Sequence, residues 1–107
     1  MSETRKPVDE ASLENEIKAK GLNAPRLTPE HIDAQIVGEH YHLVPGTALT
    51  ICVLTLKNGF HVVGESAAAS LENFDADIGQ RLARENARRK IWPLEGYLLR
   101  SKLAETE

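Results

Sequence analysis

A run of basic residues near the C-terminal end is the group whose types and spacing most readily suggest chemistry. Arg81, Arg84, Arg88, Arg89 and Lys90 place five positive charges within ten residues. On a helix, Arg81, Arg84 and Arg88 would share one face, because they are three and four residues apart. Guanidinium groups bind phosphates through two parallel hydrogen bonds. The run therefore predicts a ridge that could hold a nucleotide, an oligonucleotide or an acidic protein surface.

The same residues also fit an ordinary solvated helix face. Asp77 and Arg81, Arg81 and Glu85, and Glu85 and Arg89 are each four residues apart, which is the spacing of ion pairs along a helix. Runs of charge are usually solvated in this way. Both interpretations of the basic run remain open at this point.

Aromatic and amide side chains near the run could complete a ligand site. Phe60, Phe74, Trp92 and Tyr97 supply four of the five aromatic residues. Such rings can stack on a base beside arginine, although they are more often anchors of a core or an interface. Asn86 is a poor helix former, so it is either an exposed filler or a polar contact to a ligand or a neighbouring subunit. The candidate ligand-binding residues are Arg81, Arg84, Arg88, Asn86, Phe74 and Trp92.

Metal binding and catalysis have weaker support. His40 and His42 alternate along an extended segment and could in principle bind a metal together with His31, His61 or Cys52. Their spacing fits no established ligand pattern, so we expect neither a metal site nor a cofactor. No Ser-His-Asp signature, glycine-rich phosphate loop or paired-carboxylate motif is present. We expect no enzymatic activity.

Composition limits the class of protein. A chain of 107 residues builds one domain at most, and its net charge of −3 argues against general coating of nucleic acid. A single cysteine excludes an intrachain disulfide and fits a reducing cytosol. No apolar run approaches the roughly 18 residues of a membrane span, and the polar N-terminus does not resemble a secretion signal. We expect a soluble intracellular protein with no membrane partner.

The N-terminal part contains one weak and one strong helix signal. Residues 1–26 are polar and predict a flexible tail, or a marginal helix over 8–20 that orders only against a partner. Thr28 as N-cap, with Pro29 in the first helical position, predicts a second helix. We expect that helix to end between Gly38 and His40, and a short extended segment to follow over 41–44.

Residues 49–64 predict a β-hairpin. Asn58-Gly59 is the preferred pair for a two-residue type I′ turn, and this turn would place Leu54 opposite Val63 and Cys52 opposite Glu65. Both faces are then substantially apolar, whereas a half-buried hairpin has one polar face. One face should pack on the helices and the other on another strand or subunit, which predicts a homo-oligomer.

The last predicted element is a long helix that begins near Asn73. Ile78 and Leu82 belong to an apolar stripe that shifts sideways at Ala83, so the helix should meet two different surfaces. Pro93 predicts a kink or a break after Trp92.

The predicted fold is therefore α+β. It consists of an N-terminal capped helix, a β-hairpin that a third strand could extend to a three-stranded antiparallel sheet, and a long kinked C-terminal helix. We expect one domain over residues 27–103 and a disordered C-terminus over 104–107.

Several motifs resemble a known family. They read Leu-Thr-Leu-Lys-Asn-Gly-Phe over 54–60, Gly-Glu-Ser-Ala over 64–67, Asn-Phe-Asp over 73–75 and Lys-Ile-Trp-Pro-Leu-Glu-Gly-Tyr-Leu-Leu over 90–99. The chain resembles, over about 28–103, a small tailed-phage and prophage family named after the gene 49 and gene 66 products of two phages. Ala68 and Ala69 stand where a cysteine is expected. The resemblance implies a phage accessory protein, located in the cytoplasm of the bacterial host, without established chemistry.

Three functions from different classes follow. The first is a non-enzymatic counter-defence protein that binds an anionic nucleotide-derived immune signal between subunits, through Arg84, Arg88 and neighbouring aromatic rings. It draws on a similarity of plan to phage proteins that sequester such signals, which is an analogy of fold alone. The second is a protein-interaction module that inhibits a host or phage enzyme. The third, a small enzyme, lacks a nucleophile–base pair.

Overall fold

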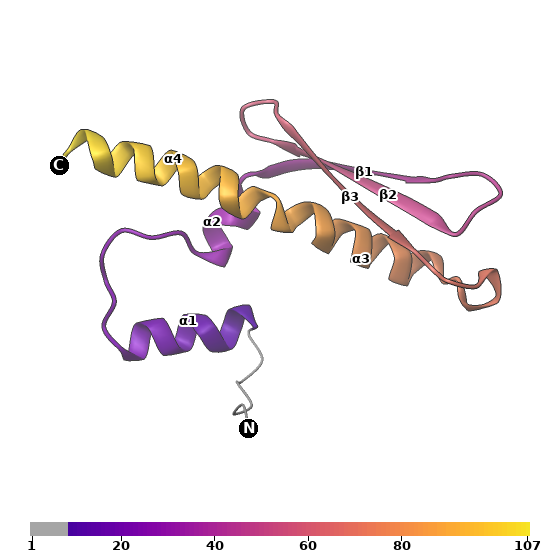
Figure 1. The fold of residues 1–107 in the computed structure, drawn as a ribbon, viewed down its shortest axis with the longest axis horizontal. Coiled ribbons are helices and arrows are strands. Elements are labelled where there is room, and N and C mark those ends of the chain that lie inside the picture. The colour runs from indigo at the N-terminus through magenta and orange to yellow at the C-terminus, as the bar shows by residue number, and fades with distance from the viewer. Residues whose placement is uncertain (1–8) are drawn as a thin grey trace, which may run out of the picture.

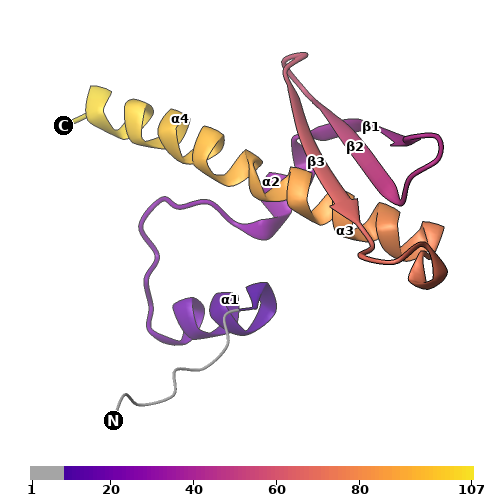
Figure 2. The ribbon, with the colours of Figure 1, turned by 45° about the vertical axis from the view of Figure 1, so that its right-hand side comes forward.

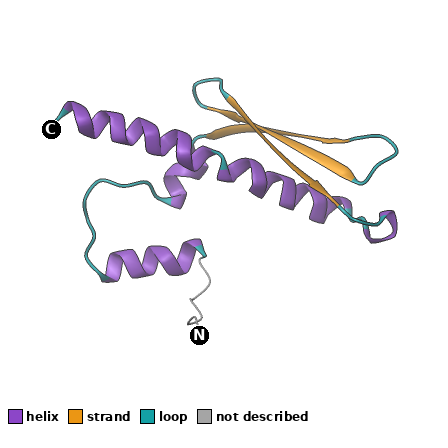
Figure 3. Cartoon of the chain, viewed as in Figure 1, coloured by secondary structure: helices purple, strands orange, loops and turns teal. Residues whose placement is uncertain are grey.

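The chain alternates helices with one antiparallel sheet, and this computed structural model describes residues 9–107 (Figures 1 and 3). The sheet has three strands in the order β1-β2-β3, so the predicted α+β class and the third strand are confirmed. The elements are α1 (Glu10–Ala19), α2 (Pro29–Ala34), β1 (Ile36–Leu43), β2 (Leu49–Leu56), β3 (His61–Ala67), the 3-10 turn η1 (Leu71–Asn73), α3 (Ala76–Arg89) and α4 (Ile91–Glu105).

The second helix begins where its cap predicts but ends earlier. The Thr28 hydroxyl oxygen accepts a hydrogen bond from the His31 amide at 3.1 Å, and Pro29 opens α2. The predicted end between Gly38 and His40 is wrong, because the chain is already a strand from Ile36 onward. Antiparallel pairing with β2, which begins at Ile36 opposite Leu56 and passes a bulge before Gly38, satisfies this backbone instead.

The hairpin forms, but its turn and register differ from the prediction. Of the two residues of the predicted turn, only Gly59 has a positive φ, of 88°. The Leu56 amide donates a hydrogen bond to the Phe60 carbonyl at 2.8 Å. This is a three-residue loop in which a glycine forms the bulge, rather than a two-residue type I′ turn. Leu54 therefore lies opposite Val62, not Val63, and Cys52 lies opposite Gly64, not Glu65.

Helix α3 covers one face of the sheet with small residues. Asp75 caps it by accepting from the Ile78 amide at 2.9 Å, and Gly79, Ala83 and Ala87 are its buried apolar positions. The first part of the predicted stripe is not buried, because Ile78 and Leu82 are 48% and 52% exposed, whereas Ala83, to which the stripe shifts, is fully buried. Small side chains let the helix backbone lie close to β2 and β3, and the larger ones remain outside.

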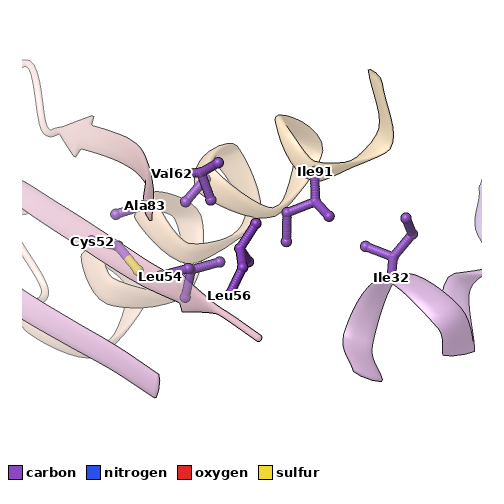
Figure 4. Close-up of a cluster of buried hydrophobic side chains, with 8 residues drawn as sticks. Ile32, Cys52, Leu54, Leu56, Val62, Ala83 and Ile91 are labelled. Atoms are coloured by element: carbon purple, nitrogen blue, oxygen red, sulfur yellow. The ribbon is translucent and has the colours of Figure 1, made fainter. Parts of the chain in front are cut away.

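The core lies between this helix, the sheet and α2. Its fully buried larger side chains come from three elements: Ile32 from α2, Cys52 and Leu54 from β2, and Ile91 from α4. Figure 4 shows Leu54, Leu56 and Val62 of the sheet pointing toward the helices, with Ile32 on the far side of Ile91. A small domain built on so few large side chains has a modest reserve of stability.

The long C-terminal helix is broken rather than continuous. Helix α3 ends at Arg89 and α4 starts at Ile91, so the break comes before Trp92 and not after it. Pro93 is tolerated as the third residue of α4, because amides in the first turn have no intrahelical partner. The helix runs on to Glu105, so part of the segment expected to be disordered over 104–107 is its last turn.

Helix α4 continues roughly in the direction of α3 and extends beyond the end of the sheet (Figures 1 and 2). Only Ile91 of α4 is buried, whereas Leu94, Tyr97 and Leu98 are 37%, 75% and 48% exposed. The radius of gyration is 17.3 Å, against about 13 Å for a compact chain of this size. The described chain is therefore extended, and a largely apolar helix projects from it.

Ion pairs connect helix α1 to the following segment and to α3. Asp9 caps α1, and no residue of α1 is buried. Arg26 contacts both carboxylate oxygens of Glu14 at 2.6 and 3.1 Å, which lowers the pKa of Glu14. Part of the region predicted as a tail or marginal helix is thus helical, while its residues 1–8 lie outside the described residues.

Candidate functional site

The basic run on α3 does not form one open ridge. Arg81 is 70% exposed and pairs with Asp77 at 3.0 Å, one helical turn away. This contact is the ion pair that the alternative interpretation of the run predicted. An exposed pair of this kind contributes little to stability and leaves the guanidinium accessible to solvent.

Arg84 belongs to a cluster under the sheet edge. Its Nε donates to Glu39 on β1 at 3.0 Å, and the Tyr41 hydroxyl donates to the other Glu39 oxygen at 3.0 Å. The hydrogen bond from Arg84 lowers the pKa of Glu39. Burial, together with the bond to Glu39, raises the pKa of Tyr41 to about 12. The cluster joins α3 to β1 across the face that holds Cys52, whose thiol pKa is raised by burial.

Arg88 is a buried connection between three helices. Only 5% of it is exposed, and its Nε donates to Asp33 of α2 at 2.7 Å. Its Nη1 donates to Glu10 of α1. Burial opposes the charged guanidinium, but the bonds to Glu10 and Asp33 outweigh it and raise the pKa of Arg88. Two carboxylates thus stand where a phosphate would have to bind.

The other predicted site residues lie apart from one another. The Asn86 amide donates to the Glu65 carbonyl of β3 at 2.8 Å and accepts from Arg89 at 2.9 Å, so it joins α3 to the sheet. Phe74 is half-buried beside Gly79 at the start of α3. Trp92 packs against the core near the break. The hydrogen-bond partners of Arg88 all come from α1 and α2.

A cleft that the sequence did not predict lies between α4 and the tip of the β2–β3 hairpin. Its volume is about 610 Å³, within the range of small-molecule sites. We call it the hairpin–α4 cleft. Its lining residues are His31, Gln35, Leu56, Lys57, Asn58, Phe60, Pro93, Leu94, Glu95, Tyr97, Leu98 and Lys102.

This cleft combines exposed rings with cations. Phe60 is 55% and Tyr97 75% exposed, and both line the cleft. Lys57 on the hairpin loop and Lys102 on α4 add two positive charges. Rings that can stack on a base, together with ammonium groups that can bind phosphate, suit an anionic nucleotide.

Local sequence rules explain how the cleft is built. The bulge at Gly59 ends the loop, and the return strand β3 begins at His61, directly after Phe60. The Lys57 amide donates to the Gln35 carbonyl at the end of α2 at 3.0 Å. The break at Lys90 then directs α4 past the hairpin tip (Figure 1). The cleft is thus assembled from α2, the hairpin loop and α4.

A side-chain hydrogen bond lies where this cleft meets a smaller one. His31 and Glu95 approach to 2.7 Å and line both the hairpin–α4 cleft and a neighbouring hollow of about 440 Å³ beside Leu27 and Leu99. Sequence reasoning noted His31 as a potential metal ligand and Phe60 and Tyr97 as rings that could stack on a base, but it included none of them among the candidate ligand-binding residues. It missed Lys57 and Lys102, since no local signal links two lysines 45 positions apart.

Within residues 9–107, no group of three or more histidine, cysteine, aspartate or glutamate side chains could hold a metal ion. In the same range, no helix has the length and apolar character to cross a membrane.

Comparison with known proteins gives one match. A family model described as the phage protein (N4 Gp49/phage Sf6 gene 66) family matches residues 27–103, which confirms the resemblance drawn from the motifs. No curated protein and no solved structure matches. The match covers α2 to α4 and leaves out α1.

Proposed function

Because the chain belongs to the phage protein (N4 Gp49/phage Sf6 gene 66) family, we propose that it is a non-enzymatic accessory protein of a phage that works by binding. Its proposed ligand is an anionic, nucleotide-derived immune signal of the bacterial host. Acting as a homo-oligomer in the host cytoplasm, it would withdraw this signal from the host enzyme that responds to it.

The observation that carries this proposal is the set of side chains that line the hairpin–α4 cleft. Phe60 and Tyr97 offer ring faces, and Lys57 and Lys102 offer charge. Stacking of one base on such a ring contributes about 1–3 kcal/mol. The proposal keeps the ligand class suggested by the sequence and moves its site from α3 to the cleft.

Binding without turnover is supported by what lines the cleft. Its residues include no serine, threonine or cysteine, the side chains that most often serve as nucleophiles. Cys52 is fully buried on the α3 side of the sheet, and burial raises the pKa of its thiol. A group held in this way is a poor nucleophile.

The test is a thermal melt of the full chain with cyclic dinucleotides, cyclic oligonucleotides and ADP-ribose derivatives. A ligand at a hundred times its Kd should stabilise the fold by about 2.7 kcal/mol, which raises Tm by roughly 10 °C. Lys57→Glu and Lys102→Glu should abolish the shift. Lys18→Glu on α1, outside the cleft, is the matched control and should retain it.

The same series decides between the cleft and α3. Arg81→Glu removes a largely exposed cation of the basic run without touching the cleft. Loss of the ligand shift in this variant, with the shift retained in Lys57→Glu, would place the ligand on α3. Absence of any shift with every nucleotide would refute the proposal.

A second candidate is favoured by the exposed apolar side of α4. Leu94, Tyr97 and Leu98 follow the i, i+3, i+4 spacing by which a helix docks into a groove of another protein. In this case the chain would inhibit a host or phage enzyme. A binding partner isolated with the native chain and lost with Leu98→Lys, together with no nucleotide-dependent melting shift, would support it.

A further inference from the structure

One face of the sheet has no cover in the described chain. Helix α3 packs on the face that carries Cys52, Leu54 and Val62. Among residues 9–107, no helix lies on the opposite face in either view (Figures 1 and 2). That open face carries, at alternating positions, His40 and His42 of β1, Ile51, Val53 and Thr55 of β2, and His61, Val63 and Glu65 of β3.

The centre of the open face is too apolar for a surface that stays in water. An antiparallel sheet with one solvated side alternates apolar and polar residues, yet β2 presents Ile51 and Val53 there, beside Val63, which is 43% exposed. Removing such apolar side chains from water is favourable. The face therefore gains free energy if another surface covers it.

The strand register arranges the open face in three cross-strand rows. The first row is His42, Ile51 and Glu65, and the second is His40, Val53 and Val63. The third is Gly38, Thr55 and His61, in which the Thr55 hydroxyl and His61 Nδ1 are 3.1 Å apart. Apart from Val63, the edge strands therefore carry polar side chains or glycine, and the central strand carries the branched side chains of Ile51, Val53 and Thr55. A more apolar centre within a polar rim is the usual anatomy of an interface.

We propose that the open face binds a second copy of this chain, sheet against sheet. The two copies are related by a two-fold axis that lies between the two sheets and is parallel to β2. Rotation about this axis keeps each residue at its level along the strands and exchanges β1 with β3. Val53 then packs on Val53 of the other copy. Two sheets in contact keep their strands within about 30° of each other at a spacing of about 10 Å.

Charge and shape at the edges of the face select this occupant. The exchange places the imidazole of His42 against the carboxylate of Glu65 in the other copy, and this contact forms twice. It also places His61 over Gly38, which has no side chain and so leaves room for the ring. In the first and third rows the face is complementary to itself when β1 meets β3, and such self-complementarity is the condition for an interface between identical copies.

This inference deepens the self-association in the proposed function, but it depends on no ligand. A measurement of molar mass tests the interface, whereas a thermal melt with nucleotides tests the ligand proposal. The hairpin–α4 cleft contains none of the open-face residues, so either proposal can fail while the other stands.

The first experiment measures the mass of the full chain by sedimentation equilibrium over a range of concentrations. The native chain should reach twice the 11.8 kDa of one copy. Val63→Lys should remain a monomer at the same concentrations, with an unchanged far-ultraviolet circular dichroism spectrum. Leu71→Lys is the matched control, since Leu71 is 67% exposed on η1, and it should still dimerise.

The second experiment tests the axis by exchange of charge. His42→Glu sets two carboxylates against each other and should weaken the dimer on the order of tenfold or more. Adding Glu65→Lys to that variant should restore dimerisation. A native chain that is monomeric throughout, a dimer that survives Val63→Lys, or a double variant that stays dissociated would each overturn the proposal.

Discussion

A Cβ atom added to Gly64 would lie 2.1 Å from the backbone nitrogen of Ala87 and 2.3 Å from the carbonyl oxygen of Ala83. The β3 backbone is therefore in direct contact with the α3 backbone at this point. The contact explains why α3 turns its small residues toward the sheet. It also fixes the height of α3 above the sheet and, through the break at Lys90, the start of α4.

Gly64→Ala should destabilise the fold by about 3 kcal/mol, because the added methyl meets helix backbone that cannot rotate away. Urea unfolding followed by circular dichroism measures this loss. Gly38→Ala is the control, since its Cβ would lie at an ordinary 3.7 Å from the Thr55 Cβ. Equal losses in the two variants would contradict the close approach of α3.

Arg88→Met should lower the free energy of unfolding by about 2 kcal/mol. The substitution removes charged hydrogen bonds to Glu10 and Asp33 that are made by a side chain only 6% exposed. Arg81→Met, which breaks only an exposed pair with Asp77, should change stability by no more than about 0.5 kcal/mol. Urea midpoints of the two variants make the comparison. A small effect of Arg88→Met would show that the three-helix connection contributes little.

Tyr41 should ionise near pH 12, because burial and its hydrogen bond to Glu39 raise its pKa from 10.0 to about 12. The folded pKa exceeds the unfolded one, so this contribution to stability is complete below pH 10 and is lost as the pH rises toward 12. Absorbance at about 295 nm in a Tyr97→Phe background follows Tyr41 alone, since the chain has two tyrosines. Ionisation near pH 10 in the folded chain would contradict the cluster.

Glu39 should contribute stability that disappears in acid. Its hydrogen bond from Arg84 lowers its pKa below the ordinary 4.5. The contribution is present above pH 4.5 and is lost as the pH falls through the folded value. Since Glu39 is 43% exposed, solvent screening keeps the effect modest. The difference in urea midpoint between the native chain and Glu39→Gln should shrink between pH 6 and pH 3, and a constant difference would argue against the pair.

Features that depend on near neighbours were predictable. The cap at Thr28 followed by Pro29, the hairpin around Gly59 and a break near Pro93 all depend on contacts within a few residues. The motifs also placed the chain in its family. The α+β class follows from these elements together.

Features that depend on partners far apart in the sequence were not predictable. Residues from Ile36 onward were assigned to a helix, because only pairing with β2 makes that segment a strand. One extra loop residue shifted the hairpin register and moved Val63 to the open face. Ile78 and Leu82 were expected inside, but the close contact at Gly64 favours the small residues of α3 there.

The candidate site shows the same division. The sequence by itself determined the charged run on α3 and its local ion pair between Asp77 and Arg81. Only the tertiary structure decided that carboxylates from α1, α2 and β1 engage Arg84 and Arg88, and that Lys57 and Lys102 share a cleft. Pairing within one helical turn is set by chain geometry, whereas pairing across the fold depends on how far apart the packed backbones lie.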